Sequence, residues 1–369
     1  MRILLAPDKF KGTLTASEVC AAITEGIHRV DASIEVLAHP LADGGEGTAD
    51  LLESALGLQR EVLTVNDPLF RPIETYYLRN EAVAFIEMAH ASGLQLLAAE
   101  ERHALNTTTY GTGELMKHAL DSGVSEIYLM IGGSSTSDGG TGMALALGYD
   151  FELAEAAYAK GTGGSLNSIS AIDNTRRHAR IDEVKFTVLC DVQNPLYGPN
   201  GAAFVYGPQK GANSDEVKQL DDGLRNLAAV SANELEQTPG AGAAGGLGYG
   251  AMSFLGADLK SGIASVMEIT GFDEKLDGVD LIVTGEGKMD LQTVEGKVIA
   301  GVSTSARAHH IPFAVICGMA EEKERVQQQI QAWGIYPLVN ENTSPEAAMA
   351  NSYELVRERA QALIEAFLH

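Results

Sequence analysis

Apolar and polar residues alternate at the start of the chain in the pattern typical of an α/β protein. Residues 2–6 form an apolar run that predicts a buried strand, and apolar residues at helical spacing predict a helix over 15–30. A second strand is expected at 34–37, followed by a helix that includes 51–56. The order strand, helix, strand, helix is how a doubly wound sheet begins.

The last hundred residues return to the same alternation. Strands are expected at 281–283, 313–316 and 336–339, each followed by a helix. Because both ends carry one pattern, we expect residues 1–60 and 280–369 to form one discontinuous α/β domain. Its fold class would be a doubly wound parallel sheet of the flavodoxin or Rossmann kind.

The middle of the chain has a different pattern. Short alternating runs at 61–65, 73–78 and 82–87 are separated by turn residues and predict an antiparallel meander. A helix at 112–120 and an apolar strand at 127–131 follow it. We therefore expect residues 61–279 to be an inserted mixed α/β domain.

A glycine- and hydroxyl-rich loop, residues 132–142, joins the strand at 127–131 to the start of a helix. Glycine allows sharp turns and close approach, and free amides at a helix start attract anions. The loop is therefore a candidate cradle for phosphate or carboxylate. The alternative is a tight structural turn between strand and helix.

Three further loops share this composition and follow predicted strands. Residues 43–48 repeat the Asp-Gly-Gly-x-Gly pattern of 138–142, and the others are 190–195 and 284–290. Each places carboxylates and backbone amides where a strand ends, which is where open α/β sheets bind ligands. The recurrence favours a ligand site over four unrelated turns.

Other sequence motifs of nucleotide binding, hydrolysis and metal binding are either absent or lack the structural context that they require. Gly240-x-Gly242-x-x-Gly245 follows a proline and not a strand, so we interpret it as a hinge or a close backbone contact. The chain has neither a P-loop sequence nor a Gly-x-Ser-x-Gly elbow. Glu87 and His90 have metal-like spacing without a partner pair, which indicates packing at a strand end.

Charge and composition restrict the partners. The 369 residues carry a formal net charge of −24, which argues against nucleic acid and anionic membranes as partners. No apolar run approaches the roughly 18 residues of a membrane helix. The three cysteines form no spaced pair, and the first residues lack a signal-peptide profile. We expect a cytoplasmic protein that binds small molecules.

The loops supply the parts that phosphoryl transfer needs, namely an anion cradle, cations and a group that orients the attacking hydroxyl. Lys9 and Lys11 follow the first strand and are placed to neutralise phosphate oxygens. Magnesium takes hard oxygen ligands, often one or two carboxylates plus substrate phosphates. The candidate carboxylates are Asp43, Glu46, Asp138, Asp191, Glu286 and Asp290.

Five segments resemble the bacterial glycerate kinase family, type I. They are 6–11 (APDKFK), 42–48 (ADGGEGT), 132–140 (GGSSTSDGG), 190–198 (CDVQNPLYG) and 284–287 (TGEG). The resemblance extends essentially from end to end. It implies an ATP-dependent kinase that acts on D-glycerate and is built of two α/β domains, with Mg²⁺ as the expected cofactor.

The expected roles follow the loops. Asp191 is the favoured acceptor of the substrate hydroxyl's proton, because a buried strand delivers it to a stiff Asn194-Pro195 corner; an Asx turn is its structural alternative. Asp43 and Lys9 complete the catalytic set, and Asp290 and Asp43 are the expected metal ligands. The expected substrate- and phosphate-binding residues are Asp8, Lys11, Gly44, Gly45, Glu46, Gly47, Thr48, Ser134, Ser135, Thr136, Asp138, Asn194 and Glu286.

Alternatives to this function stay open at the level of sequence. The resemblance favours transfer to the 2-hydroxyl, giving 2-phosphoglycerate, but a small rotation of the substrate would give 3-phosphoglycerate. A phosphosugar isomerase would use similar hydroxyl-rich loops without ATP or metal. A ligand-sensing module would leave the acidic loops without a chemical role, so the loop carboxylates favour the kinase.

Overall fold

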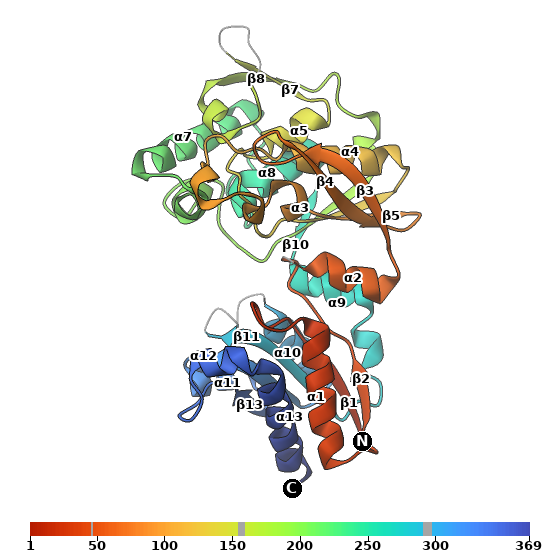
Figure 1. Cartoon of the computed structure of the whole chain (residues 1–369). Coiled ribbons are helices and arrows are strands. Elements are labelled where there is room, and N and C mark those ends of the chain that lie inside the picture. Colours follow the sequence, from red (N-terminus) through yellow and green to blue (C-terminus); the bar gives the residue numbers. More distant parts are fainter. Residues whose placement is uncertain (46, 154–158, 291–296) are drawn as a thin grey trace. The chain divides into compact units, whose positions relative to one another are not determined.

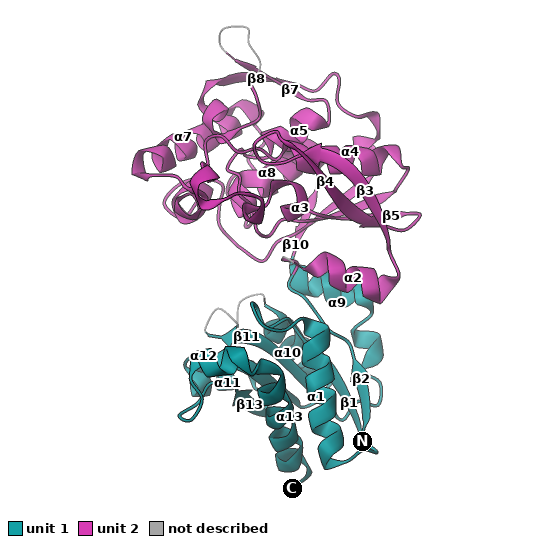
Figure 2. Ribbon diagram, viewed as in Figure 1, with its two compact units in different colours: residues 1–43, 261–369 teal, residues 44–260 magenta. Residues whose placement is uncertain are grey.

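The computed structural model describes residues 1–45, 47–153, 159–290 and 297–369. The chain divides into two compact units, and each is described by itself (Figure 2). Unit 1 comprises 1–43 and 261–369, and unit 2 comprises 44–260. The boundaries therefore differ from those expected at 60/61 and 279/280. Helix α2 (Thr48–Leu56) belongs to unit 2, and helix α9 (Gly262–Thr270) belongs to unit 1.

Unit 1 is built on a five-stranded parallel sheet of order β13-β12-β11-β1-β2, as the sequence predicts for the two chain ends (Figure 1). Its strands are β1 (Arg2–Pro7), β2 (Glu35–Ala38), β11 (Leu281–Met289), β12 (Phe313–Ala320) and β13 (Gly334–Pro337). Its other helices are α1 (Ala16–Val30), α10 (Val298–Ala308), α11 (Lys323–Ile330), α12 (Pro345–Ala350) and α13 (Ser352–Leu368). Consecutive residues of β1 are fully buried, so both faces of the sheet are covered.

Local chemistry explains how these helices begin and pack. Thr15 and Glu18 form the predicted capping box at the start of α1, and Ser344 caps α12. Helices α1 and α13 pack against each other at Gly26, where a Cβ would lie 2.3 Å from the Arg357 carbonyl oxygen. The single C-terminal helix expected after Ser344 is divided into α12 and α13 at Asn351.

The prediction of a loop at 284–290 is wrong for most of this segment, which is a strand. Strand β11 continues through Met289 and stays paired with β12, with Glu286 opposite Cys317 and Lys288 opposite Met319. Its glycines do not turn the chain. They let neighbouring backbones approach, since a Cβ on Gly285 would lie 2.1 Å from the Ile316 carbonyl oxygen.

Unit 2 contains a six-stranded mixed sheet of order β10-β9-β6-β5-β4-β3. The strands are β3 (Gln59–Asn66), β4 (Pro72–Arg79), β5 (Val83–Glu87), β6 (Glu126–Met130), β9 (Lys185–Leu189) and β10 (Asp258–Lys260). The predicted meander is confirmed as β3-β4-β5, whereas β5, β6, β9 and β10 run parallel. A separate antiparallel pair joins β7 (Asp150–Leu153) to β8 (Ile169–Asp173).

Helices surround this sheet, and a large apolar core lies between them and the strands. They are α3 (Ala89–Ser92), α4 (Tyr110–Asp121), α5 (Thr141–Ala146), α6 (Ala202–Tyr206), α7 (Ser214–Ser231) and α8 (Ala243–Leu255). Within the described ranges, no helix combines the length and apolar character that crossing a membrane requires.

The glycine-rich segment before and within α8 makes a close backbone contact, one of the two interpretations of its sequence. A Cβ on Gly245 would lie 2.0 Å from the Thr136 carbonyl oxygen, and one on Gly250 would lie 2.5 Å from that of Gly139. The Gly139 amide donates to the Gly245 carbonyl at 3.0 Å. The segment therefore packs directly on the 132–142 loop.

This contact predicts a specific stability loss. Gly245→Ala combines a positive φ of 69° with a backbone collision, whereas Gly256 has a φ of 64° and open space around it. Gly256→Ala should cost about 1 kcal/mol of the free energy of unfolding, and Gly245→Ala should cost about 1–3 kcal/mol more. Urea unfolding measures both variants, and equal losses would contradict the close contact.

Candidate active site

The carboxyl edge of the unit 1 sheet brings together several residues predicted from sequence. Asp8 and Lys9 follow β1, and the Asp8 amide donates to the Gly285 carbonyl of β11 at 2.8 Å. The Leu41 amide donates to the Pro7 carbonyl at 2.9 Å, which brings the segment leading to Asp43 to the same edge. Parallel strands collect their following residues in this way, so these side chains share one end of the sheet.

Asp8 is the most perturbed carboxyl of this edge. Burial, together with the charge of Asp43, raises its pKa to about 7. The Lys9 amide, which donates to Asp8 Oδ1 at 2.7 Å, and the charges of Lys9 and Lys297 oppose the shift. The edge is thus a compact group of two carboxyls and two ammonium groups. Lys297, which directly precedes α10, has no motif in the sequence and is identified by its effect on Asp8.

The remaining predicted residues of this edge differ in environment. Lys11 is exposed, and its backbone lies against Gly287, where a Cβ would be 3.2 Å from the Lys11 nitrogen. Glu286 is buried, and its charge adds to the effect of burial in raising the pKa of the Cys317 thiol to about 12. Asp290 lies 3.6 Å from the ammonium of Lys288, a second cation that sequence reasoning missed.

The carboxyl edge of the unit 2 sheet collects the ends of β5, β6 and β9. Glu87 is the register partner of Met130, and Met130 is that of Leu189. The 132–142 loop, Glu87 and Asp191 therefore follow neighbouring strands at one edge, as open α/β sheets arrange their ligand-binding loops.

Most of the 132–142 loop is packed inside unit 2. Asp138 is fully buried, and its carboxylate accepts hydrogen bonds from the Thr109 amide and hydroxyl, both at 2.8 Å, and from the amides of Gly140 and Gly142. Burial raises its pKa, and these donors oppose the rise. The carboxylate therefore organises the loop and joins it to the start of α4.

The hydroxyls of this loop differ in accessibility. Ser135 donates to the Ser92 carbonyl at 3.0 Å and is buried, as is Thr136. The start of the following helix, where the sequence predicts a cradle for an anion, is not accessible to a ligand, because Thr141 is buried. This helix, α5, is also short, with six residues. Ser134, 8% exposed at the outer end of the loop, is the hydroxyl best placed for a ligand beside Gly132 and Gly133.

The loop at 44–48 is held by Glu87. Its carboxylate accepts from the Gly47 amide at 3.3 Å and the Ala49 amide at 3.4 Å, so it caps the first turn of α2. Thr48 is buried, and its hydroxyl donates to the Gly45 carbonyl at 2.7 Å. Gly44 and Gly45 begin unit 2, whereas Glu46 lies outside the described residues.

The spacing of Glu87 and His90 reflects packing at a strand end, as the sequence indicates. Burial raises the pKa of Glu87, and the His90 Nε2 atom lies 4.0 Å from its carboxylate. Across the residues that the structure describes, no group of three His, Cys, Asp or Glu side chains is arranged to hold a metal.

Asp191 and Asn194 form the corner after β9. Asp191 is half-buried, and its charge adds to burial in raising the pKa of the Cys190 thiol to about 11. Asn194 donates to the Asn200 carbonyl at 2.8 Å and accepts from the Tyr206 hydroxyl at 2.6 Å. The Asn194 side chain therefore stiffens the corner.

A buried lysine that no motif predicts lies beneath the 132–142 loop. Lys210, at the end of the short 3-10 turn Pro208–Lys210, is 2% exposed. Its ammonium donates to the Ser134 hydroxyl at 2.7 Å and to the Thr136 carbonyl at 2.6 Å. Burial lowers its pKa to about 7, and Asp138 opposes the shift.

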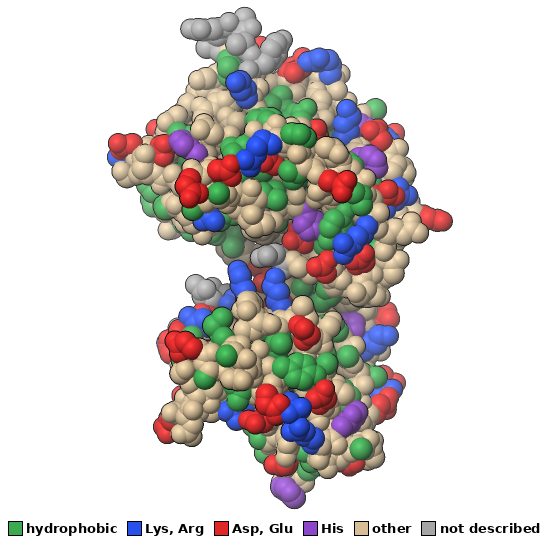
Figure 3. Space-filling model, viewed as in Figure 1, with side chains coloured by type: hydrophobic (Ala, Val, Ile, Leu, Met, Phe, Trp, Pro, Cys, Tyr) green, Lys and Arg blue, Asp and Glu red, His purple; other side chains and the backbone are tan. Residues whose placement is uncertain are grey.

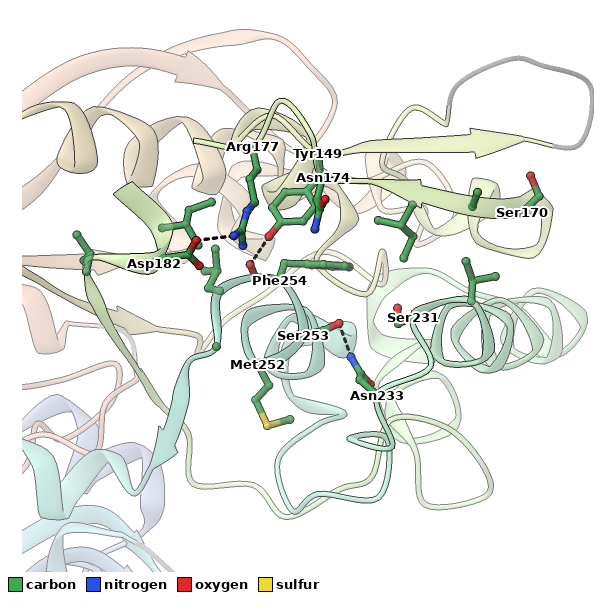
Figure 4. Close-up of a pocket in the computed structure, with 17 residues that line it drawn as sticks. Tyr149, Ser170, Asn174, Arg177, Asp182, Ser231, Asn233, Met252, Ser253 and Phe254 are labelled. Carbon is green, nitrogen blue, oxygen red and sulfur yellow. Dashed lines mark hydrogen bonds and ion pairs between the residues drawn. The ribbon is translucent and has the colours of Figure 1, made fainter. Parts of the chain in front are cut away.

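A separate cavity of about 860 Å³ lies in unit 2 near the amino ends of β9 and β10 (Figure 4). Arg177 points into it and pairs with Asp182, while Tyr149 donates to the Phe254 carbonyl. None of the site residues predicted from sequence lines it. The candidate site is therefore the carboxyl edges of the sheets, not this cavity.

An α/β fold with lysines and carboxylates gathered at the carboxyl ends of its parallel strands is the architecture of an enzyme that acts on small anionic molecules. The chain belongs to the glycerate kinase family, whose family model matches residues 3–368. The match is almost end to end, so both units lie within it.

Individual relatives agree with the family match. The chain is 39% identical to the glycerate kinase of Bacillus cereus, covering 98% of this chain and 95% of the relative. It is 39% identical to the glycerate 2-kinase of Escherichia coli, covering 96% and 94%. It also resembles the crystal structure of a protein proposed to be glycerate kinase 2 from Salmonella typhimurium LT2. That match has a TM-score of 0.87 and 36% identity, and it covers 100% of this chain and 98% of the other.

The environment of Asp8 predicts a pH-dependent stability. Its folded pKa of about 7 lies above the ordinary 3.8, so the folded protein binds a proton more tightly than the unfolded chain. This stabilisation is fully present below about pH 4 and is lost as the pH rises through about 7. The melting temperature of the wild type, measured relative to that of Asp8→Asn, should therefore fall as the pH rises from 5 to 8.

Asp31→Asn is the matched control, because hydrogen bonds from Ser33 lower the pKa of Asp31 below its ordinary value. Its difference from wild type should stay constant over pH 5 to 8. Thermal unfolding of the three proteins tests this, and parallel curves for wild type and Asp8→Asn would contradict the raised pKa of Asp8.

Proposed function

We propose that this protein transfers the γ-phosphoryl group of ATP to the 2-hydroxyl of D-glycerate, forming 2-phosphoglycerate and ADP. The observation that carries the proposal is the family match over residues 3–368. The E. coli relative, named glycerate 2-kinase, supports the 2-hydroxyl over the 3-hydroxyl. Membership of a kinase family removes the support for an isomerase or a ligand-sensing module.

Different residues at the carboxyl edges of the sheets carry the separate tasks of phosphoryl transfer. The 2-hydroxyl oxygen attacks the γ-phosphorus, the bond to the β–γ bridging oxygen breaks, and ADP leaves. Asp191 accepts the hydroxyl proton, with Asp43 as the alternative base. Lys9 and Lys11 follow β1 and neutralise anionic oxygens of the substrates. Gly132, Gly133 and Ser134 supply hydrogen bonds at the edge of unit 2.

Magnesium fits the carboxylates of unit 1. Asp43 lies close enough to Asp8 to raise its pKa, and a cation would relieve the repulsion between these two carboxylates. Asp290 is the second expected ligand, but it already faces Lys288. Bound Mg²⁺ would neutralise phosphate charge, and one or two protein carboxylates suffice to hold it together with ATP.

The surface and the cysteines support small-molecule partners and a cytoplasmic location. Asp and Glu number 50 against 26 Lys and Arg, and on the face drawn in Figure 3 both signs are interspersed. A nucleic-acid surface would need a concentration of basic side chains. Cys20, Cys190 and Cys317 are free thiols, as in a reducing compartment.

The function is tested by turnover and product analysis. ADP release should require both Mg²⁺ and D-glycerate, and L-glycerate serves as the matched control substrate. Phosphorus NMR of the product should show 2-phosphoglycerate. Absence of D-glycerate-dependent turnover would contradict the proposal, and 3-phosphoglycerate as product would contradict the position of transfer.

The role of Asp191 has its own prediction. If Asp191 accepts the proton, Asp191→Asn should lower kcat by about 10²- to 10⁴-fold with an unchanged melting temperature. Asp258→Asn is the control, because Asp258 is exposed and lies beside Thr187 in the middle of β9, not in the corner that follows this strand. Near-normal turnover of Asp191→Asn would assign Asp191 to its turn and favour Asp43 as the base.

A further inference from the structure

Lys210 occupies an unusual environment for a lysine. Lysine ammonium groups normally extend to water because burial removes their hydration. Here the ammonium is enclosed under the 132–142 loop and donates to two oxygens of that loop, Ser134 Oγ and the Thr136 carbonyl oxygen. The side chain therefore has a defined position, and its contacts are with a segment of the candidate site.

The charge of Lys210 is not cancelled by a contacting carboxylate. Both acceptors are neutral, and no ion pair joins Lys210 to a carboxylate in the described ranges. Asp138 acts on it from a distance and is itself surrounded by donors from Thr109, Gly140 and Gly142. In its protonated form, Lys210 therefore adds positive potential behind the loop, where it favours a nearby anion, and a bound anion in turn favours that form.

The contact with Ser134 also orients the hydroxyl. Because the ammonium donates to Ser134 Oγ, the hydroxyl hydrogen turns away from Lys210 and is available to an acceptor on the other side. Ser134 is the loop hydroxyl nearest the surface of unit 2. The neighbouring hydroxyls of Thr136 and Ser137 are buried without a hydrogen-bond partner among the described residues, so they do not hold this part of the loop.

We infer that Lys210 is a positioning residue that fixes the Gly132–Ser134 turn, orients the Ser134 hydroxyl and supplies a buried positive charge behind this anion-binding turn. The inference rests on the proposed kinase function. The anionic oxygens belong to the carboxylate of D-glycerate or to the phosphates of ATP, and both offer the same hydrogen-bond acceptors.

The test compares Lys210→Met, Ser134→Ala and the double variant. Lys210→Met keeps the length of the side chain but removes its charge and donors. It should raise the KM of one anionic substrate by about 10-fold or more, in the range for losing a hydrogen bond to a charged group. Because Lys210 acts through Ser134, the rise in KM caused by the double variant should be smaller than the two single variants would give if their effects were additive. Lys218→Met, an exposed lysine on α7, is the matched control with unchanged KM.

The outcomes separate the ligand and the role. A raised KM for D-glycerate assigns the carboxylate, and a raised KM for ATP assigns the phosphates. A lowered melting temperature with unchanged KM and kcat would overturn the inference and leave Lys210 a structural residue. If Lys210→Met does not fold, Ser134→Ala decides alone, since an unchanged KM in that variant overturns the inference.

Direct binding keeps this inference separate from the proposed function. Equilibrium dialysis measures ATP and D-glycerate binding by wild type and Lys210→Met without turnover. If wild type binds ATP but does not phosphorylate D-glycerate, the proposed function fails, while weaker ATP binding by Lys210→Met still supports the positioning role. Equal binding of both ligands by the two proteins overturns it, and a wild type that binds neither overturns both proposals.

Discussion

The carboxyl edge of the unit 2 sheet depends on one interaction, the set of hydrogen bonds that the buried carboxylate of Asp138 accepts. A buried charge is tolerated only when donors surround it, and here the amides of Thr109, Gly140 and Gly142 converge on one side chain. This convergence draws the loop against α4 and closes its inner half. The Gly245 contact covers the loop from another side and leaves no room for a Cβ. The outer end of the loop is then held in place for a ligand.

The buried carboxylates at the two sheet edges differ in how completely neighbouring groups compensate their charge. In unit 2, Asp138 and Glu87 accept backbone amides and hold loops in place, so their hydrogen-bonding capacity is used within the protein. In unit 1, burial raises the pKa of Asp8 as it does for those two, but Asp8 has the Lys9 amide as a donor and also the repulsion of Asp43, which raises its pKa further. A carboxylate whose charge is incompletely compensated can still gain from a cation or a proton. The ionic chemistry of the enzyme is therefore better sought among Asp8, Asp43 and the nearby lysines.

Much of this arrangement could be predicted from the sequence, because hydrophobic periodicity reports which faces are buried. The strands at both chain ends, the meander and the helix capped by Thr15 follow from that signal. Periodicity does not report whether a polar loop faces inward, so Ser135 and Asp138 looked like ligand-binding groups. It also cannot show that Gly285 lies within a strand to let β12 approach. Lys210 and Lys297 have no motif, and only the tertiary structure brings them to the sheet edges.

The position of Lys210 follows from the same constraint as that of Asp138. The loop carries one fully buried carboxylate, and a second buried charge of opposite sign lowers the electrostatic cost of both even without direct contact. Lys210 reaches the loop through Ser134 and the Thr136 carbonyl, so the electrostatic compensation is delivered at the end of the loop that remains near the surface. Stabilising the inner carboxylate and presenting positive potential to an anion are therefore two effects of one placement. A hydrophobic residue at 210 could fill the same volume, but it would provide neither effect.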